Sequence, residues 1–167
     1  MNTGQMLLAM GAMILLSTIV LRVNNNFFTT ETVLDETKYS FLATSLASSI
    51  IQEAKSKVFD NETDSASISD LNLLTLENIL GPEDAEKGKN KDVFNDFDDF
   101  DGYQDIDSTM PSAPFWYTCQ VVYVNENQPD SASSNRTWNK KITVTITSPY
   151  MSDVIKMSSI YSYWFFR

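Results

Sequence analysis

Histidine is absent from this chain of 167 residues, and cysteine occurs once, at Cys119. The absence of histidine removes the commonest general base near neutral pH and the commonest ligand of transition metals. A single cysteine can form neither a disulfide within the chain nor a cysteine-rich zinc site. The chain also has no glycine-rich phosphate loop and no nucleophile motif. We therefore expect no enzyme, and we predict that Cys119 is a small buried residue of a strand.

Basic residues are also scarce. The chain has 12 Lys and Arg residues against 22 Asp and Glu residues, which gives a formal net charge of −10. Such a chain is not attracted to nucleic acid or to anionic lipid by general electrostatics. We therefore expect no specific nucleic-acid partner. The length suits one domain with a single core, together with an appendage outside that core.

Charge is missing altogether from the first 21 residues, and the first positive charge is Arg22. Signal peptides and ordinary anchors carry basic residues in front of their apolar run. A mature N-terminus left after removal of a basic leader would lack them, and we favour this interpretation over a signal peptide or a single-pass anchor. Residues 1–26 are predicted to form an apolar helix that is long enough to enter a membrane.

A second helical pattern follows directly over residues 27–58. Apolar residues recur there at spacings of three and four, which predicts an amphipathic helix laid against a small core. Continuous with the apolar half, this helix would run about 58 residues, or roughly 85 Å. Four residues weaken it, because glycine and asparagine are poor helix formers. These predicted soft points are Gly11, Asn24, Asn25 and Asn26.

The rest of the chain predicts a head of α+β class. Residues 59–114 form a variable region with a short helix over 70–80, capped by Asp70, and an acidic loop over 92–107. Residues 115–167 predict an antiparallel meander with strands at 115–124, 140–148 and 153–166. The expected fold is a long N-terminal helix, half apolar and half amphipathic, packed on a small antiparallel sheet.

This layout resembles the type IV pilins and related pilin-like subunits, and so does the stretch "FLATSLASSIIQEAKSKVFD" after the apolar half. The resemblance implies cleavage by a prepilin peptidase, methylation of the Met1 amine, and assembly at an inner-membrane platform. It also implies a helical filament of identical copies with the apolar helices bundled at its centre. The residues expected to pack there are Gln5, Met6, Leu7, Leu8, Met10, Met13, Ile14, Leu15, Leu16, Ile19, Val20 and Leu21.

Two features depart from this family. Most members carry a glutamate at the fifth mature position, and this chain has Gln5, a neutral amide that still accepts a hydrogen bond. Many pilins also close their C-terminal region with a disulfide, which one cysteine cannot form. The expected function is that of a major pilin in an extracellular cell-surface filament, with the inner membrane holding the unassembled subunit. A type II secretion pseudopilin and a membrane-tethered Ca²⁺-binding or adhesion module are the alternatives.

The acidic loop has the sequence "DVFNDFDDFDGYQDID", with seven aspartates and no basic residue. Such density repels itself unless it is solvated or neutralised, and Ca²⁺ takes six to eight oxygen ligands in flexible geometry. The residues around Gly102 do not fit an EF-hand. No cofactor is required by the sequence, and Ca²⁺ remains an alternative to an acidic surface loop held down by its aromatic rings. The candidate Ca²⁺ ligands are Asp96, Asp98, Asp99, Asp101 and Asp105.

Overall fold

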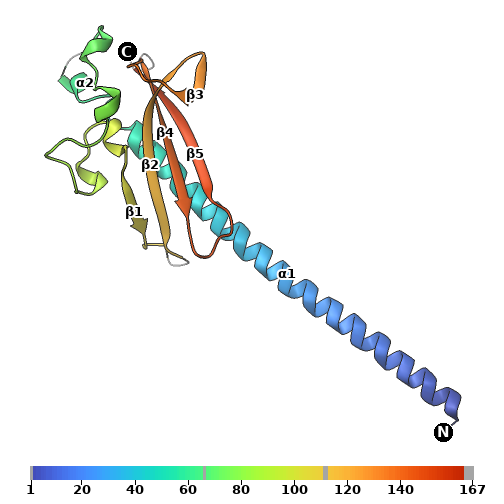
Figure 1. Ribbon diagram of the computed structural model, residues 1–167. Coiled ribbons are helices and arrows are strands. Elements are labelled where there is room, and N and C mark those ends of the chain that lie inside the picture. The colour runs from blue at the N-terminus through green and yellow to red at the C-terminus, as the bar shows by residue number, and fades with distance from the viewer. Residues whose placement is uncertain (1, 66, 111–112, 164–167) are drawn as a thin grey trace. The chain divides into compact units, whose positions relative to one another are not determined.

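A computed structural model describes residues 2–65, 67–110 and 113–163 of the chain (Figure 1). It confirms the α+β class, with a long N-terminal helix, α1 (Thr3–Lys55), followed by an antiparallel sheet. The chain divides into two units, residues 1–38 and 39–167, which we describe separately. Met1 and the last residues of the predicted strand 153–166 lie outside the described residues.

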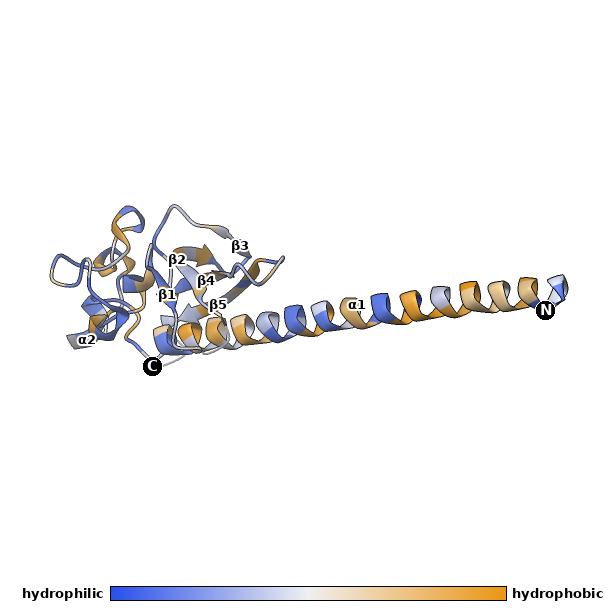
Figure 2. Cartoon of the chain, turned by 90° about the horizontal axis from the view of Figure 1, so that it is seen from below, coloured by the Kyte–Doolittle hydropathy of each residue, from blue (hydrophilic) through white to orange (hydrophobic). Residues whose placement is uncertain are grey.

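The first unit consists of the N-terminal part of α1. Its apolar side chains are exposed throughout, and Figure 2 shows the hydrophobic colour prevailing along the first turns. The helix continues unbroken through the predicted soft points Gly11 and Asn24–Asn26. Thr29 and Thr30 donate hydroxyl hydrogen bonds to the carbonyls of Asn25 and Asn26, at 2.9 and 2.8 Å. Such bonds occupy the backbone carbonyls without ending the helix.

The second unit begins where α1 becomes covered. Ala43, Ala47, Ile50, Ile51 and Ala54 are buried, as the spacing of three and four predicts. The covered face starts near residue 39, whereas the sequence pattern predicts it from residue 27. The difference has a local cause, because residues 27–38 alternate aromatic or aliphatic side chains with charged ones on all sides and so present no single apolar face.

The sheet has five strands within the described residues, in the order β1-β2-β4-β5, and β3 pairs with the far end of β2. The strands are β1 (Gln104–Asp107), β2 (Phe115–Asn125), β3 (Gln128–Ala132), β4 (Asn139–Thr147) and β5 (Ile155–Ser162). All pairs are antiparallel. Figure 1 shows β2, β4 and β5 side by side against the C-terminal part of α1, and this is where the core lies.

Alternation along the strands places one side of the sheet in the core. On β2 the buried side chains are Phe115, Tyr117, Cys119, Val121 and Tyr123, with exposed or half-buried residues between most of them. The prediction that Cys119 is a buried strand residue is confirmed. On β4, Ile142, Val144 and Ile146 face inward as predicted, and Lys140 extends the same inward series.

Three local predictions differ from the structure. The region 70–80 contains two 3₁₀ turns, Leu71–Leu73 and Glu77–Ile79, in place of the expected short helix. Asp70 does cap the first turn, since its carboxylate accepts the amide of Asn72 at 2.9 Å. Strand β1 falls in the region expected to be an irregular loop, and β3 falls in an expected hairpin connection. A further short helix, α2, spans Glu62–Ser65.

The acidic segment is folded into the head. Its rings Phe94, Phe97 and Phe100 are buried, and 3₁₀ turns occupy Lys91–Val93 and Asp98–Phe100. Phe97 packs against Tyr161 of β5 with ring centroids 5.0 Å apart. The rings thus fix the acidic segment to the head, as expected from their number. The acidic residues between them are therefore carried into the interior.

Candidate functional site

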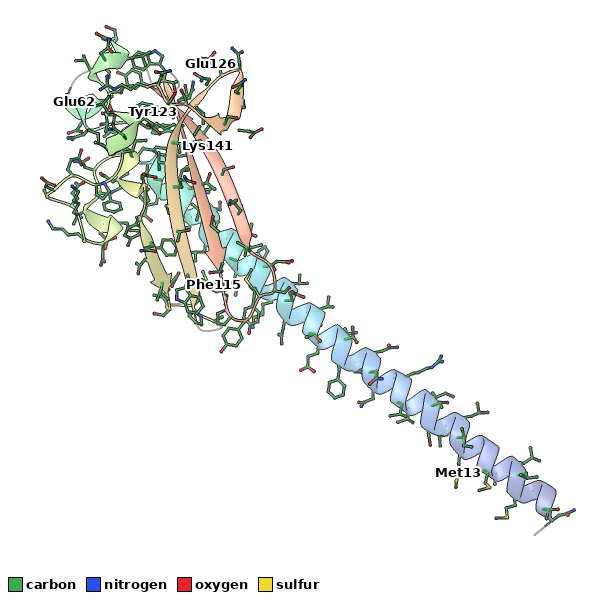
Figure 3. All side chains as sticks on the ribbon, viewed as in Figure 1. Met13, Glu62, Phe115, Tyr123, Glu126 and Lys141 are labelled. Atoms are coloured by element: carbon green, nitrogen blue, oxygen red, sulfur yellow. The ribbon has the colours of Figure 1, made fainter. Side chains whose placement is uncertain are left out.

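Two features of the chain are candidates for function, and each lies within one unit. The first is the uncovered N-terminal helix. Among the described residues, α1 alone is long and apolar enough to cross a membrane by length and composition, and none of its apolar stretch is buried. A signal sequence near an N-terminus would meet the same criteria. Leu8 is 77% exposed, and the side chain of Met13, labelled in Figure 3, is 71% exposed.

The apolar surface of this helix continues beyond the uncharged run. Phe27, Phe28, Val33 and Leu34 are all more than half exposed. They stand in pairs among threonine and acidic residues, so this part of the helix does not have the composition of a bilayer-spanning segment. The filament-core residues predicted from the sequence are all exposed within the single chain as well. Exposed apolar side chains therefore occur beyond the segment that a membrane would cover.

The second feature is a buried charge network around Lys140. The ammonium of Lys140 is fully buried and donates to the Phe59 carbonyl at 2.8 Å and to Asp60 Oδ2 at 2.8 Å. It also donates to Asp98 Oδ1, which completes its three donors. The ring of Phe59 lies 4.7 Å from the ammonium, and that of Tyr123, labelled in Figure 3, lies 5.4 Å away.

This network joins three segments of the head. Asp60 follows the end of α1, Asp98 belongs to the acidic segment, and Lys140 is in β4. Asp60 also accepts the Thr75 amide at 3.0 Å, the Thr75 hydroxyl at 3.2 Å and the Glu62 amide at 3.3 Å. Burial raises the pKa of Asp98, and the positive charge of Lys140 opposes that rise. The network is therefore a structural contact in which all three donors of Lys140 are satisfied, and Asp98 accepts one of them.

The five aspartates proposed as Ca²⁺ ligands are not brought together. Asp98 pairs with Lys140, and Asp101 Oδ1 accepts the amide of Val121 at 2.7 Å. Asp105 lies on exposed strand β1, where its carboxylate accepts the Tyr103 hydroxyl at 3.1 Å. Asp96 and Asp99 are buried close to each other without a basic partner. Of the five candidate ligands, Asp98, Asp101 and Asp105 thus make separate structural contacts, and Asp96 and Asp99 remain as a pair.

That remaining pair is joined by residues that the sequence reasoning did not include. One carboxylate oxygen from each of Glu83, Asp96 and Asp99 lies within 4.8 Å of the other two. Glu86, on the same turn as Glu83, contacts both Asp99 and Glu83. The spacing of these two glutamates could have indicated that they belong to the site, because residues three apart on a helical turn face the same side.

The features described so far define the class of fold, an α+β chain with a membrane-capable N-terminal helix and an antiparallel sheet, which is compatible with the pilin-like layout. Comparison of the chain with models of known protein families, with curated proteins and with solved structures gives no match.

Proposed function

We propose that the protein is the structural subunit of an extracellular helical filament of the type IV pilus kind, assembled through its N-terminal helix. The observation that carries this proposal is that exposed apolar side chains continue along α1 past the segment that a membrane would cover. A bilayer needs about 20 apolar residues, and the uncharged run supplies them. Phe27, Phe28, Val33 and Leu34 lie past it among polar residues, and a lipid anchor gives them nothing to pack against.

Energetics support the same proposal. Full burial of a Leu, Ile or Met side chain is worth about 1.5–3 kcal/mol relative to exposure in water. About a dozen such residues in the first 21 contribute on the order of 20 kcal/mol or more, whether lipid or other copies of the helix cover them. The inner membrane would hold the subunit before assembly, and neighbouring helices would replace the lipid afterwards. No covalent link between subunits is needed.

Gln5 fits this assembly as a neutral substitute for the glutamate that the pilin resemblance leads us to expect. Its side chain is exposed in the single chain. A neutral amide costs less to bury than a carboxylate and still accepts a hydrogen bond from an ammonium group. An amine at the N-terminus of an adjacent subunit would be a suitable donor, which is the contact that prepilin cleavage and methylation at Met1 would prepare.

The proposal is tested by Leu8→Glu, with Leu73→Glu as the matched control. Leu8 lies on the uncovered helix, whereas Leu73 is an exposed residue of the head. Both changes place a carboxylate on an exposed leucine, so they differ only in the surface that they charge. Electron microscopy of cell-surface appendages should show no filaments for Leu8→Glu and normal filaments for Leu73→Glu. Long filaments in the Leu8→Glu strain would refute assembly through this helix.

The alternative of a membrane-tethered module makes the opposite prediction. Such a module would remain monomeric when detergent is removed with the N-terminal helix intact, and it would keep an unprocessed N-terminus. Mass spectrometry of the native N-terminus and light scattering after detergent removal distinguish the two. A processed, methylated Met1 together with high-mass assemblies supports the filament. A pseudopilin would differ from a major pilin in filament length on cells.

A further inference from the structure

Two buried aspartates in the acidic segment are held so that each has one oxygen fixed. Asp96 Oδ1 accepts the amides of Asp98 and Asp99, at 2.8 and 3.2 Å. Asp99 Oδ2 accepts the amides of Asn95 and Asp96, at 2.9 and 3.0 Å. These four hydrogen bonds set the orientation of both carboxylates. The second oxygen of each, Asp96 Oδ2 and Asp99 Oδ1, is buried without a hydrogen-bond partner.

Two glutamates approach the same place from a neighbouring turn. Glu83 and Glu86 belong to one turn, in which the Glu86 amide donates to the Glu83 carbonyl at 2.8 Å. Each has an oxygen, Oε2, that is buried without a partner. Oxygens of Glu83, Asp96 and Asp99 lie within 4.8 Å of one another, and Glu86 contacts Asp99. Two separate segments therefore bring three carboxylates to one site, and Glu86 lies beside them.

No basic side chain is available to neutralise this group. Among the ion pairs of the described residues, none includes Glu83, Glu86, Asp96 or Asp99. Lys140 is the nearby buried cation, but its three donors are already taken by Phe59, Asp60 and Asp98. Several buried polar atoms without partners in one place are uncommon, because each costs about 1–3 kcal/mol. The close approach of Glu83, Asp96 and Asp99, each with one oxygen buried and unpartnered, indicates a missing positive charge.

We propose that Glu83, Glu86, Asp96 and Asp99 bind a divalent cation, and that this cation is Ca²⁺. The donor set consists of carboxylate oxygens, which suit hard cations and not the softer metals that select imidazole or thiolate. Ca²⁺–O distances of about 2.3–2.6 Å allow ligand oxygens on one ion to lie up to about 5 Å apart, in accord with the spacing here. Ca²⁺ also accepts irregular sets of six to eight ligands, and water can complete the set beside Glu83.

The electrostatics of the group agree with this assignment. Burial, followed by the charges of Asp98 and Asp99, raises the pKa of Asp96 to about 9. Burial, followed by contacts with Asp99 and Glu83, raises the pKa of Glu86 to about 7. Carboxylates this close repel one another when they are ionised, and a bound Ca²⁺ would offset that repulsion.

The test uses the full chain, purified in detergent and stripped with EDTA, because the site does not depend on filament assembly. Its thermal midpoint is measured in EDTA, in CaCl₂ and in MgCl₂ at equal concentration, and Ca²⁺ binding is measured by titration calorimetry. At a hundredfold excess over Kd, we expect Ca²⁺ to raise the midpoint by on the order of 10 °C. Mg²⁺ should raise it less, because Mg²⁺ demands a regular octahedral site and gives up its water reluctantly.

Two variants and one control locate the site. Asp99→Asn and Glu86→Gln each remove one charge, and each should reduce Ca²⁺ affinity at least tenfold. In EDTA both should melt no lower than the wild type, since their amides can donate to neighbouring carboxylates and relieve repulsion. A merely structural role for these side chains predicts a lower midpoint in EDTA and no change in the response to Ca²⁺. Asp92→Asn, an exposed aspartate of the same segment, is the matched control and should bind Ca²⁺ like the wild type.

Four outcomes would overturn the proposal. Absence of both a Ca²⁺ shift and a binding heat in the wild type would mean that the carboxylates share protons and hold no metal. An equal loss of affinity in Asp92→Asn would mean that the loop binds by diffuse charge and not at this site. Unchanged affinity in Asp99→Asn and Glu86→Gln would place the ion elsewhere. An Mg²⁺ shift as large as the Ca²⁺ shift would reject Ca²⁺ as the preferred ion.

Discussion

Replacement of Lys140 by methionine tests whether the buried charge network holds the head together. Methionine is close to lysine in length and fills the same space with an apolar side chain. It cannot neutralise Asp60 and Asp98, whose side chains are 0% and 3% exposed, or donate to the Phe59 carbonyl. The folded state would then hold two buried carboxylates without their positive partner. The best matched control is Lys141→Met, the same change on the next residue of β4, labelled in Figure 3.

The size of the effect follows from burial. Removing one partner from a buried ion pair costs about 3–5 kcal/mol, and the unpaired Phe59 carbonyl adds roughly 1 kcal/mol. We therefore expect Lys140→Met to lower the free energy of unfolding of the head by about 4 kcal/mol or more. That is a large part of the about 5–15 kcal/mol typical of a whole domain. Lys141 makes one exposed hydrogen bond, to the Pro129 carbonyl at 2.8 Å, so its replacement should cost less than about 1 kcal/mol.

The assay is denaturant unfolding of the full chain in detergent, followed by tyrosine and tryptophan fluorescence and near-ultraviolet circular dichroism. A third chain, carrying Lys140→Met with Asp60→Asn and Asp98→Asn, should recover much of the lost stability because no buried charge remains in it. If Lys140→Met unfolds at the same denaturant concentration as Lys141→Met, the network contributes no net stability and the reasoning fails. A triple variant less stable than Lys140→Met would refute the explanation by unpaired charge.

Three further predictions concern the core, the turns and the single thiol. Burial raises the pKa of the Cys119 thiol to about 12, so the reactive thiolate is scarce at pH 8. Iodoacetamide should therefore label Cys119 rapidly only in denaturant, and fast labelling of the native chain would contradict this. Phe97→Ala should cost about 3–5 kcal/mol, whereas Phe41→Ala, at an exposed ring, should cost less than about 0.5 kcal/mol, and equal unfolding midpoints would refute the buried position of Phe97. Gly81→Ala should destabilise the head, because the backbone φ of Gly81 is +120°, a conformation that residues with a side chain rarely adopt. Gly11→Ala should stabilise α1 by up to about 1 kcal/mol, measured as helix content on heating.

Local patterns were sufficient to predict the long helix and the central strands. A repeat of three and four identified the buried face of α1 from Tyr39 onward, and strict alternation identified β4. Both patterns arise from the geometry of one element against one core, so neighbours in sequence carry the information. The region 70–80 shows the limit of such patterns. Its leucine-rich composition is typical of a helix. In the structure it forms two short 3₁₀ turns instead, and Asp70 caps the first of them.

The candidate cation site could be predicted only in part. The density of aspartates directed attention to the acidic segment, but it could not distinguish Asp98 from Asp99. Adjacent residues there point to different partners, Asp98 to Lys140 and Asp99 toward Glu83 and Glu86. Lys140 lies 42 residues after Asp98, whereas Glu83 and Glu86 lie 16 and 13 residues before Asp99. A local sequence pattern does not reveal contacts over such separations. Lys140 did have a local signal, because it continues the inward phase of Ile142, Val144 and Ile146.

The Lys140 network also sets an order in which the head can become stable during synthesis. The ribosome releases Asp60 and Asp98 well before Lys140, so the two carboxylates that must enter the interior wait for their counter-charge until β4 emerges. A nascent or truncated chain that ends before residue 140 would keep the acidic segment outside any folded core and open to proteases. An unfinished chain would therefore differ from a complete one in its sensitivity to proteolysis.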